Sequence, residues 1–244
     1  QGSAPLVFSH TATPGAYVLL AVVGYGHDSG CEFAAVTYGG EPMTPLGQVH
    51  LGATASDGTL GLFGLANAPG GQQTVHVTAS AGCSVVVNTV SYRNISWAAL
   101  VEETVSGSGS GPNALSQSVK PEFGQPVVQV FANRGNAVMS ALTGGTNRWR
   151  YPAGTGAGIG LAISEATAAT VFTADLDGHD HWGALAVQLG RTSIAEPMRG
   201  SLAPTDRFRA AVQQAKIGPI NDIPRVTPEV ILKYVTDLQL LGLL

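Results

Sequence analysis

The sequence predicts a mainly β protein, a two-sheet β-sandwich of jelly-roll type that is followed by a short C-terminal α-helical segment. The 244-residue chain has 32 glycines, and only 11% of its residues are charged, against roughly 25% in an average domain. Short runs rich in β-branched residues recur between Gly, Pro, Asn and Ser, and some alternate with a period of two. After Arg191 the apolar spacing becomes helical, which predicts the C-terminal segment.

The expected strands form two similar series. The first series lies near residues 5–10, 16–24, 33–38, 42–50, 59–65, 73–79 and 84–92, and the second near 99–105, 115–119, 126–132, 138–151, 158–164, 169–174 and 182–189. Each series has a Gly-Gly hairpin signal at the same place, Gly39-Gly40 and Gly144-Gly145. The stretch between the series, SGSGSGPN at 106–113, is typical of a flexible crossing. Neither half is expected to cover both faces of a sheet alone, so the two are expected to form one sandwich.

A change in charge divides the chain near Arg191. Residues 1–190 contain five Lys/Arg and eleven Asp/Glu, a net charge of −6, whereas residues 191–244 contain seven and five, a net charge of +2. We therefore expect a sandwich domain over 1–190, and a linker with two short docking helices over 191–244. The total net charge of −4 argues against a nucleic-acid partner. Gln1 is followed by no pattern typical of a signal peptide.

The last helix is predicted to start at an N-cap, Thr227, with Pro228 at its first position. One face is apolar and is the expected interface; it comprises Val230, Ile231, Tyr234, Val235, Leu238 and Leu241. This face is expected either to bind another chain, giving a homo-oligomer or a larger assembly, or to pack back on the sandwich. The apolar stretch is too short for a membrane span and contains Lys233 and Asp237.

No motif in the sequence predicts catalysis. DLDGHDHW, residues 175–182, loosely resembles a cation-binding loop but lacks its full spacing, and we interpret it as a polar hairpin. The chain contains no G-x-S-x-G elbow and no phosphate-binding loop. We therefore expect no enzyme activity, no cofactor and no metal site.

Two pairs of features are candidates for binding or cross-linking. NRWRY, residues 147–151, places Trp149 and Tyr151 on one face of a strand and Arg148 and Arg150 on the other. The aromatic pair could stack on a sugar ring, such as that of a cell-wall glycan, with the arginines as donors, or it could fill the core. Cys31 and Cys83 either pair in an oxidising compartment or remain two buried thiols.

Several phrases resemble a β-sandwich module of minor tail proteins in phages that infect actinobacteria. They are Ser9-His10-Thr11, the hairpin Val36-Thr37-Tyr38-Gly39-Gly40 and the turn Asn67-Ala68-Pro69. The resemblance covers residues 5 to about 190, and the ending KYVTDLQLLGLL resembles the close of such proteins. It implies a noncatalytic structural protein of the virion, at the tail tip or fibre, with other virion proteins as partners. A glycan-binding module and a minor capsid or decoration protein are the alternatives.

Overall fold

The computed structural model describes residues 5–26, 30–80, 82–100, 105–109, 113–121, 125–135, 137–151, 158–178 and 180–190. The chain divides into two compact units, Gln1–Thr192 and Ser193–Leu244. The predicted helix at 227–244 and its apolar face lie outside the described residues, so the account below concerns the first unit. Within the described ranges, no helix has the length and apolar character needed to cross a membrane.

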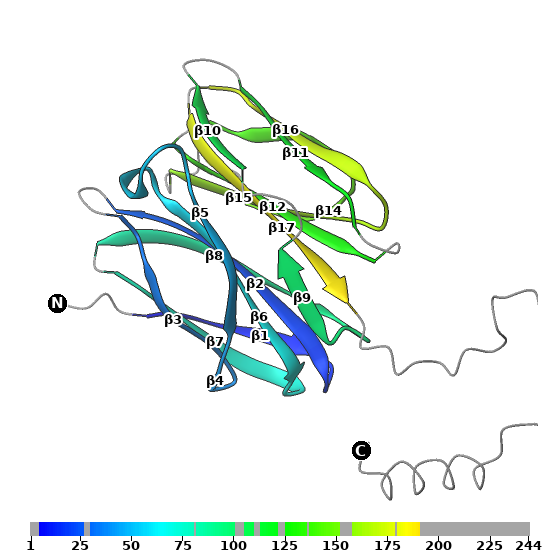
Figure 1. Cartoon of the computed structure of the whole chain (residues 1–244). Coiled ribbons are helices and arrows are strands. Elements are labelled where there is room, and N and C mark those ends of the chain that lie inside the picture. The colour runs from blue at the N-terminus through cyan, green and yellow to red at the C-terminus, as the bar shows by residue number, and fades with distance from the viewer. Residues whose placement is uncertain are drawn as a thin grey trace, which may run out of the picture. The chain divides into compact units, whose positions relative to one another are not determined.

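The prediction of a mainly β protein is confirmed, but the strands form four sheets rather than two (Figure 1). Residues 5–92, which we call half 1, build sheets A and B. In spatial order, the strands of sheet A are β1 (Leu6–Ala12), β7 (Gly71–Ala79), β3 (Phe33–Tyr38) and β4 (Glu41–Pro42). Those of sheet B are β5 (Thr44–His50), β6 (Thr59–Ala68), β2 (Ala16–Gly26) and β8 (Cys83–Tyr92). A 3-10 turn, η1 (Ala55–Asp57), precedes β6.

Residues 97–190, which we call half 2, build sheets C and D. In order, the strands of sheet C are β10 (Val105–Gly109), β17 (Asp180–Gly190), β12 (Val127–Arg134), β15 (Ile159–Ala166) and β14 (Thr146–Tyr151). A further strand, β9 (Trp97–Leu100), also pairs with β17. The strands of sheet D are β11 (Asn113–Val119), β16 (Thr170–Leu176) and β13 (Met139–Thr143). All described pairings are antiparallel.

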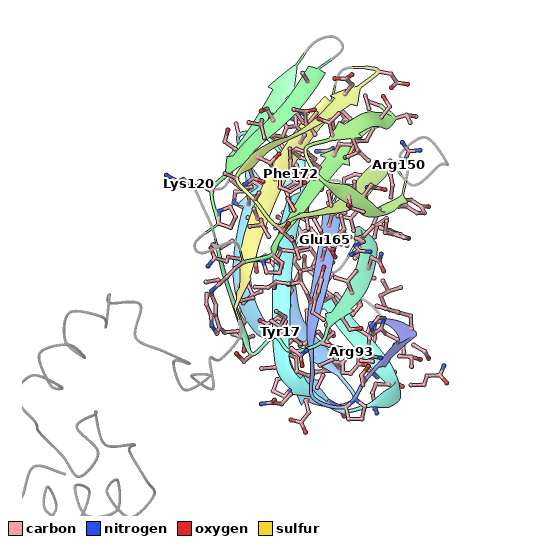
Figure 2. The ribbon with its side chains drawn as sticks, turned by 90° about the vertical axis from the view of Figure 1, so that its right-hand side faces the viewer. Tyr17, Arg93, Lys120, Arg150, Glu165 and Phe172 are labelled. Carbon is pink, nitrogen blue, oxygen red and sulfur yellow. A yellow bond between two sulfur atoms is a disulfide. The ribbon has the colours of Figure 1, made fainter. Side chains whose placement is uncertain are left out.

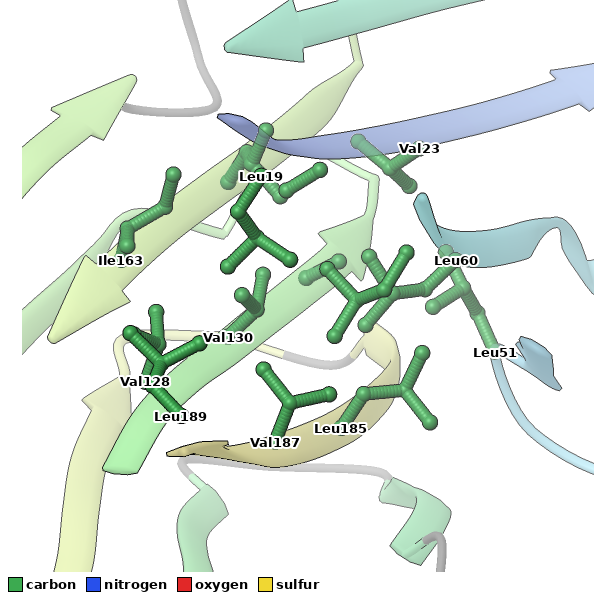
Figure 3. Close-up of a cluster of buried hydrophobic side chains, with 14 of the residues drawn as sticks. Leu19, Val23, Leu51, Leu60, Val128, Val130, Ile163, Leu185, Val187 and Leu189 are labelled. Atoms are coloured by element: carbon green, nitrogen blue, oxygen red, sulfur yellow. The ribbon is translucent and has the colours of Figure 1, made fainter. Parts of the chain in front are cut away.

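Three apolar cores hold the sheets in the order A, B, C, D. One core joins A to B and includes Val18, Leu20 and Val75, and another joins C to D and includes Phe131 and Phe172. The third joins B to C. Its members include Leu19, Val23, Leu51, Leu60, Val128, Val130, Ile163, Leu185, Val187 and Leu189 (Figure 3). The two inner sheets are therefore covered on both faces.

Strand β2 shows why the prediction of a single two-sheet sandwich was wrong. Its run AYVLLAVVG is buried almost throughout: Val18, Leu20 and Val22 face sheet A, and Leu19 and Val23 face sheet C. A continuous apolar run is typical of a strand that is covered on both faces, whereas a two-sheet sandwich needs only alternation. Each fully buried aliphatic side chain contributes roughly 1.5–3 kcal/mol. The sequence therefore contained the signal for two inner sheets.

Several expected elements differ in the structure. The single strand expected at 42–50 is divided between β4 and β5. The single strand expected at 138–151 is two strands, β13 and β14, separated by Gly144-Gly145, with Gly144 at φ +87°. The stretch expected to be a flexible crossing, 106–113, contains most of β10 and the first residue of β11. β10 pairs with β17 in an antiparallel ladder. A Gly/Ser-rich stretch has no apolar alternation, so its sequence pattern did not predict a strand there.

The two halves have matching strand registers and contact one another through corresponding strands. In half 1, Gly24 pairs with Thr59 and Val85; in half 2, Asn133 pairs with Gly160 and Trp182 on the corresponding strands. Strand β6 lies against β17, and the corresponding β15 lies against β8. The next residues along, Tyr25 and Arg134, contact one another, with the guanidinium carbon 4.6 Å from the ring centroid. Such reciprocal contact characterises a two-fold interface.

Candidate functional site

The segment predicted to bind a ligand, residues 148–151, lies on the edge strand β14. The rings of Trp149 and Tyr151 stack, with centroids 6.2 Å apart and planes 22° apart. Trp149 is half-buried and packs against the core between sheets B and C. Trp149 therefore covers the rim of this core with Tyr151 stacked on it, and ligand binding by the pair stays a prediction.

The two arginines of this segment do not share a face as expected. The register of β14 against β15 shifts between Asn147 and Trp149, and this bulge redirects Arg148. Its Nε donates to Oε2 of Glu165 at 2.6 Å. Arg150 instead donates from Nη1 to the carbonyl oxygen of Met139 in sheet D, at 3.0 Å. Strict period-two alternation cannot predict a bulge, so the sequence placed the arginines together incorrectly.

Glu165, labelled in Figure 2, lies on β15 and links the two halves. Besides Arg148, its carboxylate accepts a hydrogen bond from the hydroxyl of Tyr92 on β8, in half 1. Burial, together with this hydrogen bond, raises the pKa of the Tyr92 hydroxyl above its usual range. The hydroxyl therefore stays protonated and acts as a donor near neutral pH.

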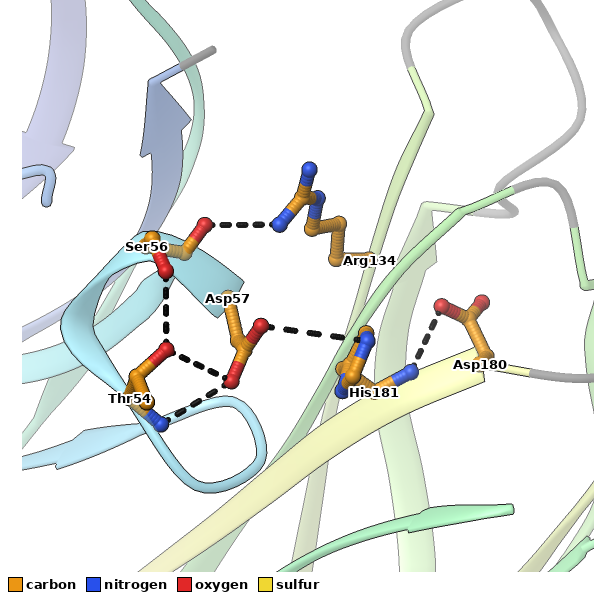
Figure 4. A network of polar contacts seen from close by, with 6 residues as sticks. All are labelled: Thr54, Ser56, Asp57, Arg134, Asp180 and His181. Atoms are coloured by element: carbon orange, nitrogen blue, oxygen red, sulfur yellow. Dashed lines mark hydrogen bonds and ion pairs between the residues drawn. The ribbon is translucent and has the colours of Figure 1, made fainter. Parts of the chain in front are cut away.

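A second polar group joins the halves at the η1 end of the B–C interface (Figure 4). We call it the junction cluster, and it comprises Thr54, Ser56, Asp57, Arg134, Asp180 and His181. Half 1 contributes the η1 turn, and half 2 contributes the end of β12 and the start of β17. Residues far apart in the sequence thus meet at one place.

Asp57 is fixed by the turn that carries it. Its Oδ2 accepts hydrogen bonds from the backbone N–H and the hydroxyl of Thr54, both at 2.9 Å. Burial acts to raise the pKa of Asp57, but the bonds from Thr54 and the nearby His181 outweigh it, and the pKa lies below its usual value. Asp57 is therefore an anion near neutral pH.

His181 and Arg134 reach across to this turn. Nε2 of His181 lies 3.8 Å from Oδ1 of Asp57, and Nη1 of Arg134 donates to the carbonyl oxygen of Ser56 at 2.6 Å. Gly52 permits the close approach: its φ is +98°, and an added Cβ would lie 2.6 Å from Nδ1 of His181. The Asp57 carboxylate and the His181 imidazole form an ion pair across the halves when the imidazole is protonated.

Asp180 is the buried member of the cluster, with 2% of its surface exposed. Its carboxylate accepts hydrogen bonds from Nδ2 of Asn133 at 2.7 Å and from the backbone N–H of His181 at 2.9 Å. Burial raises the pKa of Asp180 to about 6, although these hydrogen bonds oppose the change. The group therefore titrates close to the physiological range.

Sequence reasoning missed the junction cluster. Asp180 and His181 belong to the segment that we interpreted as a polar hairpin, and they begin β17 after the turn. The strand expected at 182–189 begins two residues earlier in the structure, at Asp180. With that start, period-two alternation places Asp180 on the same face as the buried Ala184 and Ala186. In the part of the chain that the structure describes, no three His, Cys, Asp or Glu side chains are arranged to hold a metal ion.

Cys31 and Cys83 form a disulfide in the structure, with Cα atoms 5.9 Å apart. Cys83 is the first residue of β8 and is in register with Gly26 of β2. Cys31 lies in the connection from β2 to β3 and is buried. The disulfide thus closes the end of sheet B that lies beside η1.

Three bacterial relatives match part of the chain. A carboxylic acid reductase of Mycobacterium marinum is 73% identical over 48 residues, which are 20% of this chain and 4% of that protein. A carboxylic acid reductase of Mycobacterium tuberculosis is 64% identical over 50 residues, again 20% of this chain and 4% of that protein. An isonitrile lipopeptide synthase of M. tuberculosis is 54% identical over 63 residues, 25% of this chain and 2% of that protein. No known family matches the chain, and no solved structure matches it.

These relatives overturn the functional expectation from the sequence. They are named as mycobacterial biosynthetic enzymes, not as phage tail proteins. The expected virion structural role, its glycan-binding and capsid alternatives, the virion location and the absence of enzyme function are therefore wrong. The phrases that suggested a tail protein are turns and core strands, which many unrelated sandwiches share. Assembly into a homo-oligomer stays a prediction.

Proposed function

We propose that this chain is a component of a biosynthetic enzyme that acts on carboxylic acids, and that the segment it shares with the two reductases does the same work in each. The observation that carries the proposal is the 73% identity over 48 residues. Such identity over so short a stretch fits a discrete segment that is reused between larger proteins. The chain spans only 4% or less of the length of these relatives, so the rest of their chemistry comes from other parts.

Within this proposal, we assign the shared segment to the second unit, Ser193–Leu244. The support is its size: it contains 52 residues, close to the 48 and 50 residues of the reductase matches. The first unit is then the part that this chain adds. Its two-sided cores and cross-half hydrogen bonds make it a firm body on which a polar group such as the junction cluster can be held.

We further propose that each half of the first unit is a jelly roll of its own. The support is the strand order. In half 2, β17-β12-β15-β14 faces β11-β16-β13, and in half 1 the corresponding strands are β8-β2-β6-β5 and β1-β7-β3. The predicted jelly roll is thereby duplicated instead of being formed once from both series.

A graft tests the proposed function. The matched 48 residues of the M. marinum reductase are replaced by their counterpart from this chain, and consumption of a carboxylic acid is measured. We expect the graft to reduce the acid at a rate comparable to that of the unaltered reductase, and deletion of the segment to lower the rate. A folded graft as inactive as the deletion would contradict the proposal, and so would a fully active deletion. A 48-residue stretch of the first unit, grafted at the same place, is the matched control.

A further inference from the structure

The Cys31–Cys83 disulfide belongs to half 1 alone. Both cysteines of the chain lie in that half, and the corresponding strand of half 2, β17, contains none. The strand register that the two halves share therefore does not require this cross-link. The residues that contact the disulfide connect it to the η1 turn, as the next contacts show.

Ser80 fastens the residues around Cys31 to the start of β8. Its hydroxyl accepts the backbone N–H of Glu32 at 3.0 Å and lies 3.4 Å from the carbonyl oxygen of Gly30 and 3.3 Å from Sγ of Cys83. The backbone N–H of Ser80 also donates to the carbonyl oxygen of Glu32 at 2.9 Å. Residues 30–32 are thus held by one covalent bond and by hydrogen bonds to the hydroxyl and the backbone of Ser80. Each hydrogen bond contributes modestly, about 1 kcal/mol.

Residues 30–32 pack against the η1 turn through Gly30. A Cβ added to Gly30 would lie 2.7 Å from Cβ of Ala55, so the backbone at Gly30 is packed directly on Ala55. Ala55 begins η1, whose next two residues contact Arg134 and His181. The loop that contains η1 is closed at its ends by a hydrogen bond from the N–H of Leu51 to the carbonyl oxygen of Gly58, at 2.9 Å. A continuous line of contacts therefore runs from the disulfide to the junction cluster.

We propose that the Cys31–Cys83 disulfide is a redox latch: its oxidation state determines whether the junction cluster is held in the arrangement described above. In the oxidised protein it holds residues 30–32 against η1, and η1 presents Asp57 to His181. In the reduced protein these residues lose their covalent anchor, η1 loses its packing partner, and the contacts between η1 and half 2 weaken. This inference is independent of the proposed function.

The reduction step uses a dithiol as electron donor. Cys83 is half-buried and Cys31 is 1% exposed, so a thiolate of the dithiol attacks Sγ of Cys83. The Cys31–Cys83 bond breaks, Cys31 leaves as the thiolate and takes up a proton, and a mixed disulfide forms on Cys83. The second thiol of the reagent then displaces Cys83 and closes a cyclic disulfide. Two electrons pass to the protein, which ends with two thiols.

Amide hydrogen exchange on the full chain, with and without dithiothreitol, tests the latch. We expect exchange in the loop 51–58 to become about tenfold faster or more on reduction, as a loss of one or two contacts implies, while the centres of β2 and β12 stay protected. The imidazole signals of His181 shift in the same step. The double variant Cys31→Ser/Cys83→Ser shows the faster exchange without reductant and does not respond to dithiothreitol.

Two results would overturn the latch. One is unchanged exchange in 51–58 after a thiol assay has shown complete reduction. The other is loss of protection throughout both halves, because the disulfide would then be a staple of the whole unit. If the double variant does not fold, the reduced natural chain gives the same readout. Gly30→Ala provides a matched probe: its added methyl group pushes residues 30–32 from Ala55 and is expected to speed exchange in 51–58 with the disulfide intact.

Discussion

Half 1 and half 2 share a strand order and a register but differ in the chemistry of their outer cores. At corresponding positions, Leu20 pairs with Phe63 in half 1, and Gln129 pairs with Ser164 in half 2. All four side chains point away from the interface between sheets B and C. One fold thus encloses an apolar pair in one half and a polar pair in the other.

The difference extends over the whole of each half. Among the described residues, the buried polar side chains of half 1 are Thr59 and Thr89, whereas those of half 2 are Gln117, Gln129, Asn133, Ser164, Asp180 and Gln188. Both polar atoms of Gln129 are without a hydrogen-bond partner within the described residues, and the side chain is fully buried. Burying such groups costs free energy. Strand alternation and turns therefore set the architecture, and the identity of an inward residue sets how stable each half is.

The largest expected change in stability comes from replacing Leu20 of half 1 by glutamine, the residue at the corresponding position 129 of half 2. Leu20→Gln removes a fully buried aliphatic side chain and inserts an amide into an apolar core. We expect the free energy of unfolding to fall by about 3–5 kcal/mol. Urea denaturation followed by tryptophan fluorescence measures the change. A loss below about 1 kcal/mol would show that the outer cores tolerate either residue equally.

The reciprocal change, Gln129→Leu, is expected to raise the free energy of unfolding by about 1–3 kcal/mol, because it removes two buried polar atoms that have no hydrogen-bond partner among the described residues. Gln188→Leu is the matched control: Nε2 of Gln188 donates to Oε1 of Gln125 at 2.7 Å, so this change breaks a bond and gains less. If Gln129→Leu destabilises the chain as much as Leu20→Gln does, the comparison between the halves fails.

A smaller effect concerns pH and the buried Asp180 of half 2. Its pKa of about 6 in the folded chain lies above the ~3.9 of an unfolded aspartate, so the folded chain binds more protons in this window and loses stability as pH rises through it. Asp180→Asn removes this titrating group and is the reference. The free energy of unfolding of the natural chain, minus that of Asp180→Asn, is expected to fall by about 1–3 kcal/mol between pH 4 and pH 7. Denaturation of both proteins at several pH values measures this; a difference that is constant with pH would contradict it.

The smallest effect is expected where the halves meet at Glu165. Arg148 is 54% exposed along its side chain, so Arg148→Ala is expected to lower the free energy of unfolding by only about 0–1 kcal/mol. Tyr92→Phe removes the half-buried bond to the same carboxylate and is expected to cost more, about 1–2 kcal/mol. Thermal melts of the two variants decide the order. An equal or larger loss for Arg148→Ala would show that the exposed ion pair within half 2 stabilises the chain at least as much as the tyrosine bond that joins the halves.

Much of the fold was readable from local patterns. The alternation in Thr74–Thr78, the continuous apolar run of β2 and the Gly-Gly pairs at 39–40 and 144–145 lie where strands and turns occur. These signals depend on neighbours in the chain, so a sequence displays them directly. The similarity of the two series likewise corresponds to the shared register of the two halves.

The functional groups were less readable, for two physical reasons. The bulge that redirects Arg148 leaves no mark in an alternating sequence, since one extra residue in a strand changes no residue type. Asp57 and His181 come from different halves, and their approach depends on how sheet B packs on sheet C. Neither local propensity nor spacing contains that information.

By itself, the sequence determined a mainly β chain with two matching series of strands, because side-chain alternation and turn chemistry act over a few residues. Only the tertiary structure decided that the series form two separate sheet pairs, that Asp57 meets His181 and that the disulfide closes beside η1. These features depend on which distant strands pair and which faces are covered, and burial of both faces of β2 and β12 is what selects that arrangement.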